Sequence, residues 1–216
     1  MNGAGDAARL ARDVERIGVD FDGVVHDLHR RVCARIRDRH GIEYHPEDID
    51  EWDPELPTGE MLTDEIEPLI ESESALRRTE AVPGAPDGMR SLADAGYTLV
   101  MVTHRPASIH GPIRRWLDER SVPYHEFVAD VPQNKGLVDI DLLIEDRPLN
   151  VRNALREGTH AIHFTGAWDG GERLSDARPN GRLADRDAAA EDDGIGVEPV
   201  LRRADSWSEV LHLIGV

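Results

Sequence analysis

The sequence predicts an α/β fold in which helices cover both faces of a parallel sheet. Two observations carry this prediction. Short apolar runs alternate with amphipathic stretches along most of the 216 residues, and the runs are too apolar to have one face in water. Strands of that kind are typical of parallel sheets that are buried on both sides.

Six strands and four helices are expected in the sheet and its covering layers. The strands are expected at 16–21, 97–102, 126–129, 142–145, 161–164 and 197–201. The helices are expected at 86–95, 108–120, 149–156 and 207–214. Ser206 and Glu209 have the spacing of a capping box at the start of the last helix.

One interval interrupts the alternation of strands and helices. Residues 24–82 contain no convincing strand, and helices are expected there at 26–39 and within 59–73. We therefore predict a core made of 1–23 and 83–216, with a small helical cap at 24–82 placed to cover the end of the first strand. Residues 175–196 are acidic, aperiodic and rich in Gly, Asp and Ala, which is typical of a solvated flexible loop.

Composition excludes some partners. The formal net charge of −18 argues against a nucleic-acid polymer or an anionic membrane, because both would repel the chain. The acidic, arginine-rich and lysine-poor composition is of the halophilic type, although a GC-rich codon bias would also favour arginine. A single cysteine, Cys33, and the lack of a signal-like or long apolar segment favour a cytoplasmic protein.

Two carboxylates follow the first expected strand directly. Asp20 and Asp22 lie two residues apart, so their side chains point to the same side of an extended chain, and Gly23 allows a sharp turn after them. Two adjacent anions repel each other unless a cation or a shared proton offsets them. The pair indicates a divalent metal and chemistry on an anion, but it could also be a polar strand end that leads into a turn.

Polar residues follow the later strands as well. Thr103 and His104 follow the second strand, Lys135 follows the third, and Glu145 with Asp146 follow the fourth. Ligands bind at the carboxyl ends of the strands in such sheets. Lys135 is the one lysine among 25 basic residues, which suggests a specific task for a compact ammonium group. The set fits phosphoryl transfer assisted by Mg²⁺.

This order of residues resembles the four motifs of the haloacid dehalogenase superfamily, which has a Rossmann-like core. The run DLLIEDRP at 141–148 is more narrowly similar to the 5′(3′)-deoxyribonucleotidase-type branch. The resemblance implies that Asp20 is the nucleophile that forms an aspartyl-phosphate and that Asp22 is the general acid and base. It also implies that Thr103 and Lys135 bind the phosphoryl group. Asp20, the backbone carbonyl of Asp22 and Asp146 would hold Mg²⁺.

Several assignments stay open. The branch more often has two aspartates where this chain has Glu145 and Asp146, so Glu145 is a second possible metal ligand and Asp146 is the preferred one. His104 is a further candidate for the phosphate site. His26 and His29 share a face of the expected helix, where they could bind a transition metal, although we read them as structural or surface residues.

The expected function is a Mg²⁺-dependent phosphomonoesterase that acts on a nucleoside monophosphate. Tyr44 and Trp52 of the cap could stack on the base, or they could simply pack the cap. A phosphatase of sugar phosphates or other small metabolites is the alternative within the same chemistry. A receiver-like signalling module is a remote alternative, because its phosphoacceptor would precede Thr103 on a different strand.

Overall fold

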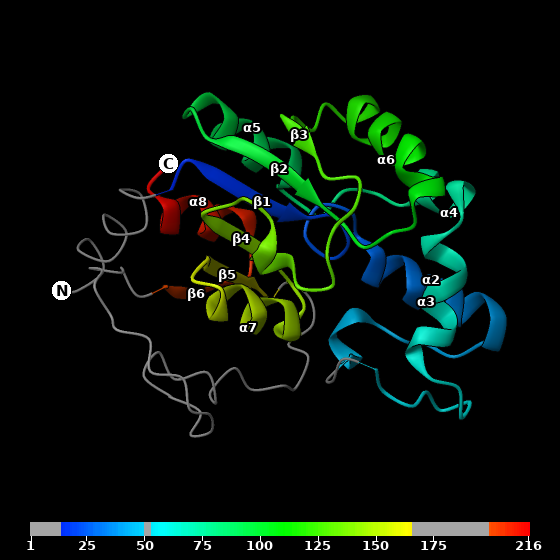
Figure 1. Cartoon of the computed structure of the whole chain (residues 1–216). Helices are drawn as coiled ribbons and strands as arrows, with labels where there is room; N and C mark the ends of the chain where they lie inside the picture. The colour runs from blue at the N-terminus through cyan, green and yellow to red at the C-terminus, as the bar shows by residue number, and fades with distance from the viewer. Residues whose placement is uncertain (1–13, 50–52, 166–198) are drawn as a thin grey trace, which may run out of the picture.

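The computed structural model describes residues 14–49, 53–165 and 199–216, and its centre is a six-stranded sheet in which every pair of neighbours is parallel. The order across the sheet is β3-β2-β1-β4-β5-β6, so the first strand lies in the middle (Figure 1). The strands are β1 (Arg16–Asp20), β2 (Thr98–Val102), β3 (Glu126–Phe127), β4 (Leu142–Glu145), β5 (His160–Phe164) and β6 (Leu201–Ala204).

Helices cover both faces of this sheet, as the sequence predicts. Val19 and Met101 face a large apolar cluster that also contains residues of α5 (Ala85–Asp94), α6 (Ala107–Glu119) and α8 (Trp207–Ile214). Val100 and Leu143 face the opposite side, where α7 (Pro148–Arg156) packs. The predicted α/β class is therefore confirmed.

Three local predictions differ from the structure. The last strand, β6, begins four residues later than expected. It includes the charged pair at 202–203, which an edge strand tolerates because it is only partly buried. β3 has only two residues. The capping box at α8 is only half present: Ser206 Oγ accepts from the Glu209 N–H, whereas the Glu209 carboxylate accepts from the N–H of Asp205.

The segment predicted as a cap, 24–82, contributes no strand to the sheet in its described parts, 24–49 and 53–82. It contains α2 (Leu28–His40), the 3₁₀ turn η1 (Pro46–Asp48), α3 (Leu62–Ile70) and α4 (Glu73–Arg78). The helix expected within 59–73 is α3, and a further helix, α4, follows it because Ser72 caps α4 by accepting a hydrogen bond from the Ala75 N–H. The cap has its own apolar cluster, built mainly from α2 and α3.

The cap lies beyond the carboxyl ends of the central strands. In Figure 1, α2 and α3 are side by side at the end toward which β1 and β2 point. α4 fastens the cap to the core, since Leu76 belongs to the core cluster and Trp116 of α6 donates to the Thr79 carbonyl at 3.1 Å. The loop expected at 175–196 lies outside the described residues.

Among the helices in the described ranges, none is both long enough and apolar enough to cross a bilayer.

Candidate active site

Asp20 occupies the carboxyl end of the central strand, and the turn that follows is built around Gly23. The Asp20 side chain is buried, and its Oδ1 accepts a hydrogen bond of 2.7 Å from the N–H of Phe21. Gly23 has φ of +75°, a region that favours glycine. A Cβ at this position would lie 1.9 Å from Oδ2 of Asp146. Gly23 therefore lets the first strand's turn and the Asp146 carboxylate occupy adjoining space.

Lys135 is placed by a short turn that packs closely on α7. It begins the 3₁₀ turn η2 (Lys135–Leu137), which Asn134 caps by accepting from the Gly136 N–H at 3.0 Å. A Cβ at Gly136 would lie 2.8 Å from the Cα of Ala154, so a larger residue would push the turn away from α7. The close packing directs the ammonium of Lys135 into the buried site.

The Lys135 ammonium joins two carboxylates that belong to different strands. Its Nζ lies 2.8 Å from Oδ1 of Asp20 and 2.7 Å from Oε2 of Glu145. Burial alone would lower the pKa of Lys135, but the attraction of Asp20 and Glu145 outweighs it and raises the pKa above its usual value. The two carboxylates therefore favour the charged form of Lys135.

A cluster of three buried carboxylates surrounds this lysine. Asp20, Glu145 and Asp146 each offer an oxygen atom, and these atoms lie within 4.8 Å of one another. Burial and the nearby Glu145 carboxylate raise the pKa of Asp20 and of Asp146 well above the usual value. The site thus holds more negative charge than its lysine offsets.

Charge and donor chemistry fit a divalent cation at this cluster. With Asp22, the site has four carboxylates, which face the two cations Lys135 and Arg105. Four carboxylates outnumber the three cations that line the cavity, Lys135, Arg105 and Arg147, so negative charge remains for a bound cation to offset. Clustered oxygen ligands without thiolates suit a hard cation such as Mg²⁺.

Glu145 and Asp146 differ in how much of their hydrogen-bonding capacity the protein itself uses. Oε2 of Glu145 accepts from Lys135, and its Oε1 accepts from the Arg147 N–H at 3.0 Å. The Asp146 carboxylate instead lies beside Gly23 and 3.7 Å from the Nε2 of His29, which comes from the cap. The protein therefore holds Glu145 more firmly and leaves Asp146 closer to the turn after β1.

The Asp22 carboxylate makes an ion pair that the sequence analysis missed. Arg105 donates from Nε and from Nη2 to the two oxygens of Asp22, both at 2.8 Å. Burial would raise the pKa of Asp22, but the Arg105 guanidinium and hydrogen bonds from His26 and Arg105 hold it well below the usual value. Because the chain is so rich in arginine, the only sequence signal for a role of Arg105 was its position two residues after Thr103.

His26 and His29 do not share a helix face, contrary to the expectation from sequence. His26 precedes α2 and stacks on Phe21 with 4.8 Å between the ring centroids, and its Nδ1 lies 3.0 Å from Asp22. His29 is in α2 and lines the cavity described next. The earlier start expected for the helix caused this error.

A cavity of about 190 Å³ connects the strand ends to the cap. The strand ends contribute the polar wall of the cavity, which includes Thr103 and the exposed His104. The Nε2 atom of His104 lies 3.0 Å from the carbonyl oxygen of Pro132. The cap contributes an apolar wall formed by five aliphatic side chains: Leu28, Ile49, Leu62, Ile66 and Ile70. A ligand in this cavity would meet charge at one end and hydrocarbon at the other.

The aromatic residues expected at the cap do not line this cavity in the described part of the chain. Tyr44 is buried in the apolar cluster of the cap, and its hydroxyl lies 3.4 Å from the Asp48 carbonyl. Trp52 lies outside the described residues. Most of the described cap side chains that line the cavity are aliphatic, and His29 and Thr63 are the polar ones.

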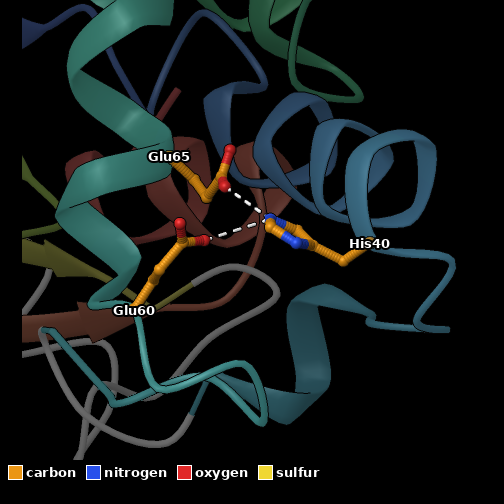
Figure 2. Close-up of side chains that lie close together, drawn as sticks. All are labelled: His40, Glu60 and Glu65. Carbon is orange, nitrogen blue, oxygen red and sulfur yellow. Dashed lines mark hydrogen bonds and ion pairs between the residues drawn. The ribbon is translucent and has the colours of Figure 1, made fainter.

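A second group of carboxylates lies within the cap. Figure 2 shows the His40 ring directed at Glu60 and Glu65, with Nε2 at 3.2 Å and 2.8 Å from their oxygens. Glu65 also pairs with Arg35 at 2.7 Å and with Arg39. Because two guanidinium groups already offset its charge, this group is an ion-pair network that joins α2 and α3 and is a poor cation site.

Comparisons with known proteins agree with this geometry. A family model for "5′ nucleotidase, deoxy (Pyrimidine), cytosolic type C protein" matches residues 12–169. The chain is 30% identical over 164 residues to the "Putative 5′(3′)-deoxyribonucleotidase" of Chlorobaculum tepidum, which covers 68% of this chain and 77% of that protein. It is 24% identical over 139 residues to the 5′(3′)-deoxyribonucleotidase of Clostridium acetobutylicum, over 63% and 76% of the two chains.

A solved structure supports the fold. The "predicted phosphatase" from Clostridium acetobutylicum superposes with a TM-score of 0.54 at 16% identity, over 92% of this chain and 96% of that one. The capped parallel sheet and its carboxylates at the strand ends define an enzyme of the haloacid dehalogenase-type phosphatase class. Within that class, the chain belongs to the family of deoxy (pyrimidine) 5′ nucleotidases of cytosolic type C.

Proposed function

We propose that this enzyme is a Mg²⁺-dependent phosphomonoesterase that hydrolyses nucleoside monophosphates, with deoxyribonucleotides preferred. The observation that carries the proposal is the cavity with two unlike ends. Buried carboxylates and Lys135 suit a metal-bound phosphate, and the aliphatic side chains of the cap suit a base or sugar. The names of the curated relatives favour deoxyribonucleotides.

Each polar residue at the strand ends has a place in the proposed reaction. Asp20 attacks phosphorus, the bond to the leaving oxygen breaks, and Asp22 supplies the proton that this oxygen needs. Water then attacks the aspartyl-phosphate, Asp22 takes its proton, and the Asp20 carboxylate is restored. Thr103 hydrogen-bonds a phosphoryl oxygen, and Lys135 offsets the charge of that oxygen. His104 lines the cavity and is placed to contact the phosphoryl group.

Asp20, the backbone carbonyl of Asp22 and Asp146 are the proposed Mg²⁺ ligands. Glu145 is the weaker candidate, because both of its oxygens already accept hydrogen bonds within the protein. The bound ion would offset the charge that builds up on the phosphoryl oxygens. Lys135 favours the ionised form of Asp20 and contacts its Oδ1, which leaves Oδ2 available for attack.

Phosphate release from a substrate panel tests this function. The panel contains deoxyribonucleoside and ribonucleoside monophosphates, sugar phosphates and p-nitrophenyl phosphate, each with Mg²⁺ or with EDTA, at low and at multimolar salt. We expect the highest kcat/KM on a deoxyribonucleoside monophosphate and no turnover in EDTA. A higher kcat/KM on a sugar phosphate would support the alternative metabolite phosphatase. Nucleotide cleavage no better than that of p-nitrophenyl phosphate would overturn the nucleotidase assignment.

A further inference from the structure

The contact between Arg105 and Asp22 has the geometry of a rigid clamp. Arg105 is buried, with a side chain 2% exposed, and its fork reaches both oxygens of one carboxylate at 2.8 Å. A bidentate pair of this kind fixes the plane of the carboxylate as well as its distance. A lysine at this position could make only a single point contact.

Arg105 itself is held from several sides. Its N–H donates to Oγ1 of Thr103 at 3.2 Å, and its carbonyl accepts from Nε2 of His110 at 2.8 Å. The guanidinium carbon lies 5.4 Å from the centre of the Phe21 ring, and Nη1 lies 3.4 Å from the carbonyl of Ile70, at the end of cap helix α3. The orientation of Asp22 is therefore set by the Arg105 guanidinium, which core residues hold in place and which also contacts the cap.

His26 adds a third contact to the same carboxylate. Its Nδ1 lies 3.0 Å from Oδ1 of Asp22, and its ring is held between Phe21 and Trp116. A carboxylate has about four acceptor positions, two on each oxygen. In the described part of the chain, Nη2 of Arg105 and Nδ1 of His26 use the two positions on Oδ1, and Nε of Arg105 uses one on Oδ2. The position that remains is on Oδ2.

We propose that Arg105, assisted by His26, is a positioning residue for the second half of the reaction. It aims the free position on Oδ2 of Asp22 at the water that hydrolyses the aspartyl-phosphate. In that step the water oxygen bonds to phosphorus, the bond from phosphorus to the Asp20 oxygen breaks, and the proton of the water passes to Asp22. This proposal rests on the phosphatase function proposed above.

Pre-steady-state kinetics with p-nitrophenyl phosphate separate the two halves of the reaction. Its leaving group departs without the help of an acid, so Asp20 can be phosphorylated even when Asp22 is misplaced. In Arg105→Lys we expect a burst of about one nitrophenol per active site and then a steady-state rate about 100-fold below the parent, in line with the loss of a general base. Phosphoenzyme at Asp20 accumulates, as measured by mass spectrometry after an acid quench.

Further variants keep the test decisive. His26→Gln should show the same pattern with a smaller drop, and it replaces Arg105→Lys if the latter does not fold. The double variant with Arg105→Lys and Asp22→Asn should have the same steady-state rate as Asp22→Asn alone, because each substitution removes the same function of Asp22. Arg115→Lys is the control, since Arg115 is exposed and pairs with Glu73 outside the site.

The possible outcomes distinguish this proposal from the proposed function. If the rate of the burst and the steady-state rate of Arg105→Lys fall by the same factor, and no phosphoenzyme accumulates, the positioning role of Arg105 is overturned. The phosphatase function would stand in that case. A parent enzyme that releases phosphate from no monoester would overturn the proposed function itself.

Discussion

The ammonium of Lys135 lies 2.8 Å from a carboxylate oxygen of Asp20, and the Lys135 side chain is only 1% exposed. The two residues are far apart in the sequence, and they meet because β1 lies beside β4 and the turn η2 packs on α7. A buried ion pair is costly unless further contacts complete it. Here Glu145 completes it, and the three side chains behave as one electrostatic unit.

Replacing Lys135 with methionine should damage both stability and activity. The substitution keeps the unbranched shape of the side chain and all but one atom of its length, but leaves two buried carboxylates without their cation. We expect the free energy of unfolding to fall by about 3 kcal/mol and phosphatase activity to be lost, as measured by urea unfolding and phosphate release. Arg90→Met is the control, because Arg90 pairs with Asp87 on the surface. Parental stability in the Lys135 variant would contradict the importance of this pair.

Gly23→Ala should abolish activity, whereas Gly41→Ala should not. Both glycines have positive φ, +75° and +69°, so alanine is strained by a similar amount at each, about 1–2 kcal/mol. Only at Gly23 would the new Cβ collide with Asp146, while nothing lies within 4 Å at Gly41. Activity titrated against Mg²⁺ measures the difference. Equal activity in the two variants would show that the turn and Asp146 are not coupled.

The sequence was sufficient to place the polar residues at the strand ends. Asp20, Thr103, Lys135 and Asp146 line one cavity because parallel strands bring their carboxyl ends to one edge, which strand order alone implies. The Arg105 clamp could not be predicted in the same way. Whether an arginine two residues past a strand turns inward depends on packing against Phe21 and the cap, and neither contact leaves a pattern in the sequence.

The cap shows a similar limit of sequence reasoning. Aromatic residues were the natural candidates for base recognition, but Tyr44 fills the core of the cap. The aliphatic side chains that face the cavity come from separate segments, for example Leu28 in α2 and Ile66 in α3. Their convergence depends on how the helices cross, which hydrophobic periodicity does not specify.

Ile66→Ala should weaken the binding of the nucleoside more than that of the phosphate. The loss of apolar contact should raise KM for a nucleoside monophosphate about 10-fold, with a much smaller change for a phosphate ester that has no base, such as glycerol phosphate. Ile42→Ala is the matched control, because Ile42 packs against the same cap cluster but is not among the residues that line the cavity. Equal effects on both substrates would place the base elsewhere.

Glu65→Gln should make the stability of the protein less sensitive to acid. Burial would raise the pKa of Glu65, but hydrogen bonds from His40 and Arg35 and the charge of Arg39 outweigh it and lower the pKa. A lowered folded-state pKa means that the stabilisation is complete above the unfolded pKa, about 4.3, and is lost as the pH falls through the folded value.

The difference in the free energy of unfolding between the parent and Glu65→Gln should therefore depend on pH. At pH 7 the variant should be less stable by about 2 kcal/mol, and the gap in the free energy of unfolding should narrow below about pH 4. Urea unfolding at a series of pH values measures it. Glu67→Gln, on an exposed position of the same helix, is the control. A gap that stays constant with pH would show that the Glu65 pKa is not shifted by folding.

Phosphate release by Asp20→Asn tests the aspartyl-phosphate mechanism most directly. The measurement compares the parent, Asp20→Asn and Asp139→Asn on a deoxyribonucleoside monophosphate with Mg²⁺; Asp139 is the control because its side chain is 95% exposed. If Asp20 is the nucleophile, kcat of Asp20→Asn falls at least about 1,000-fold and no phosphoenzyme forms, while Asp139→Asn matches the parent. Full Mg²⁺-dependent turnover by Asp20→Asn would contradict the mechanism.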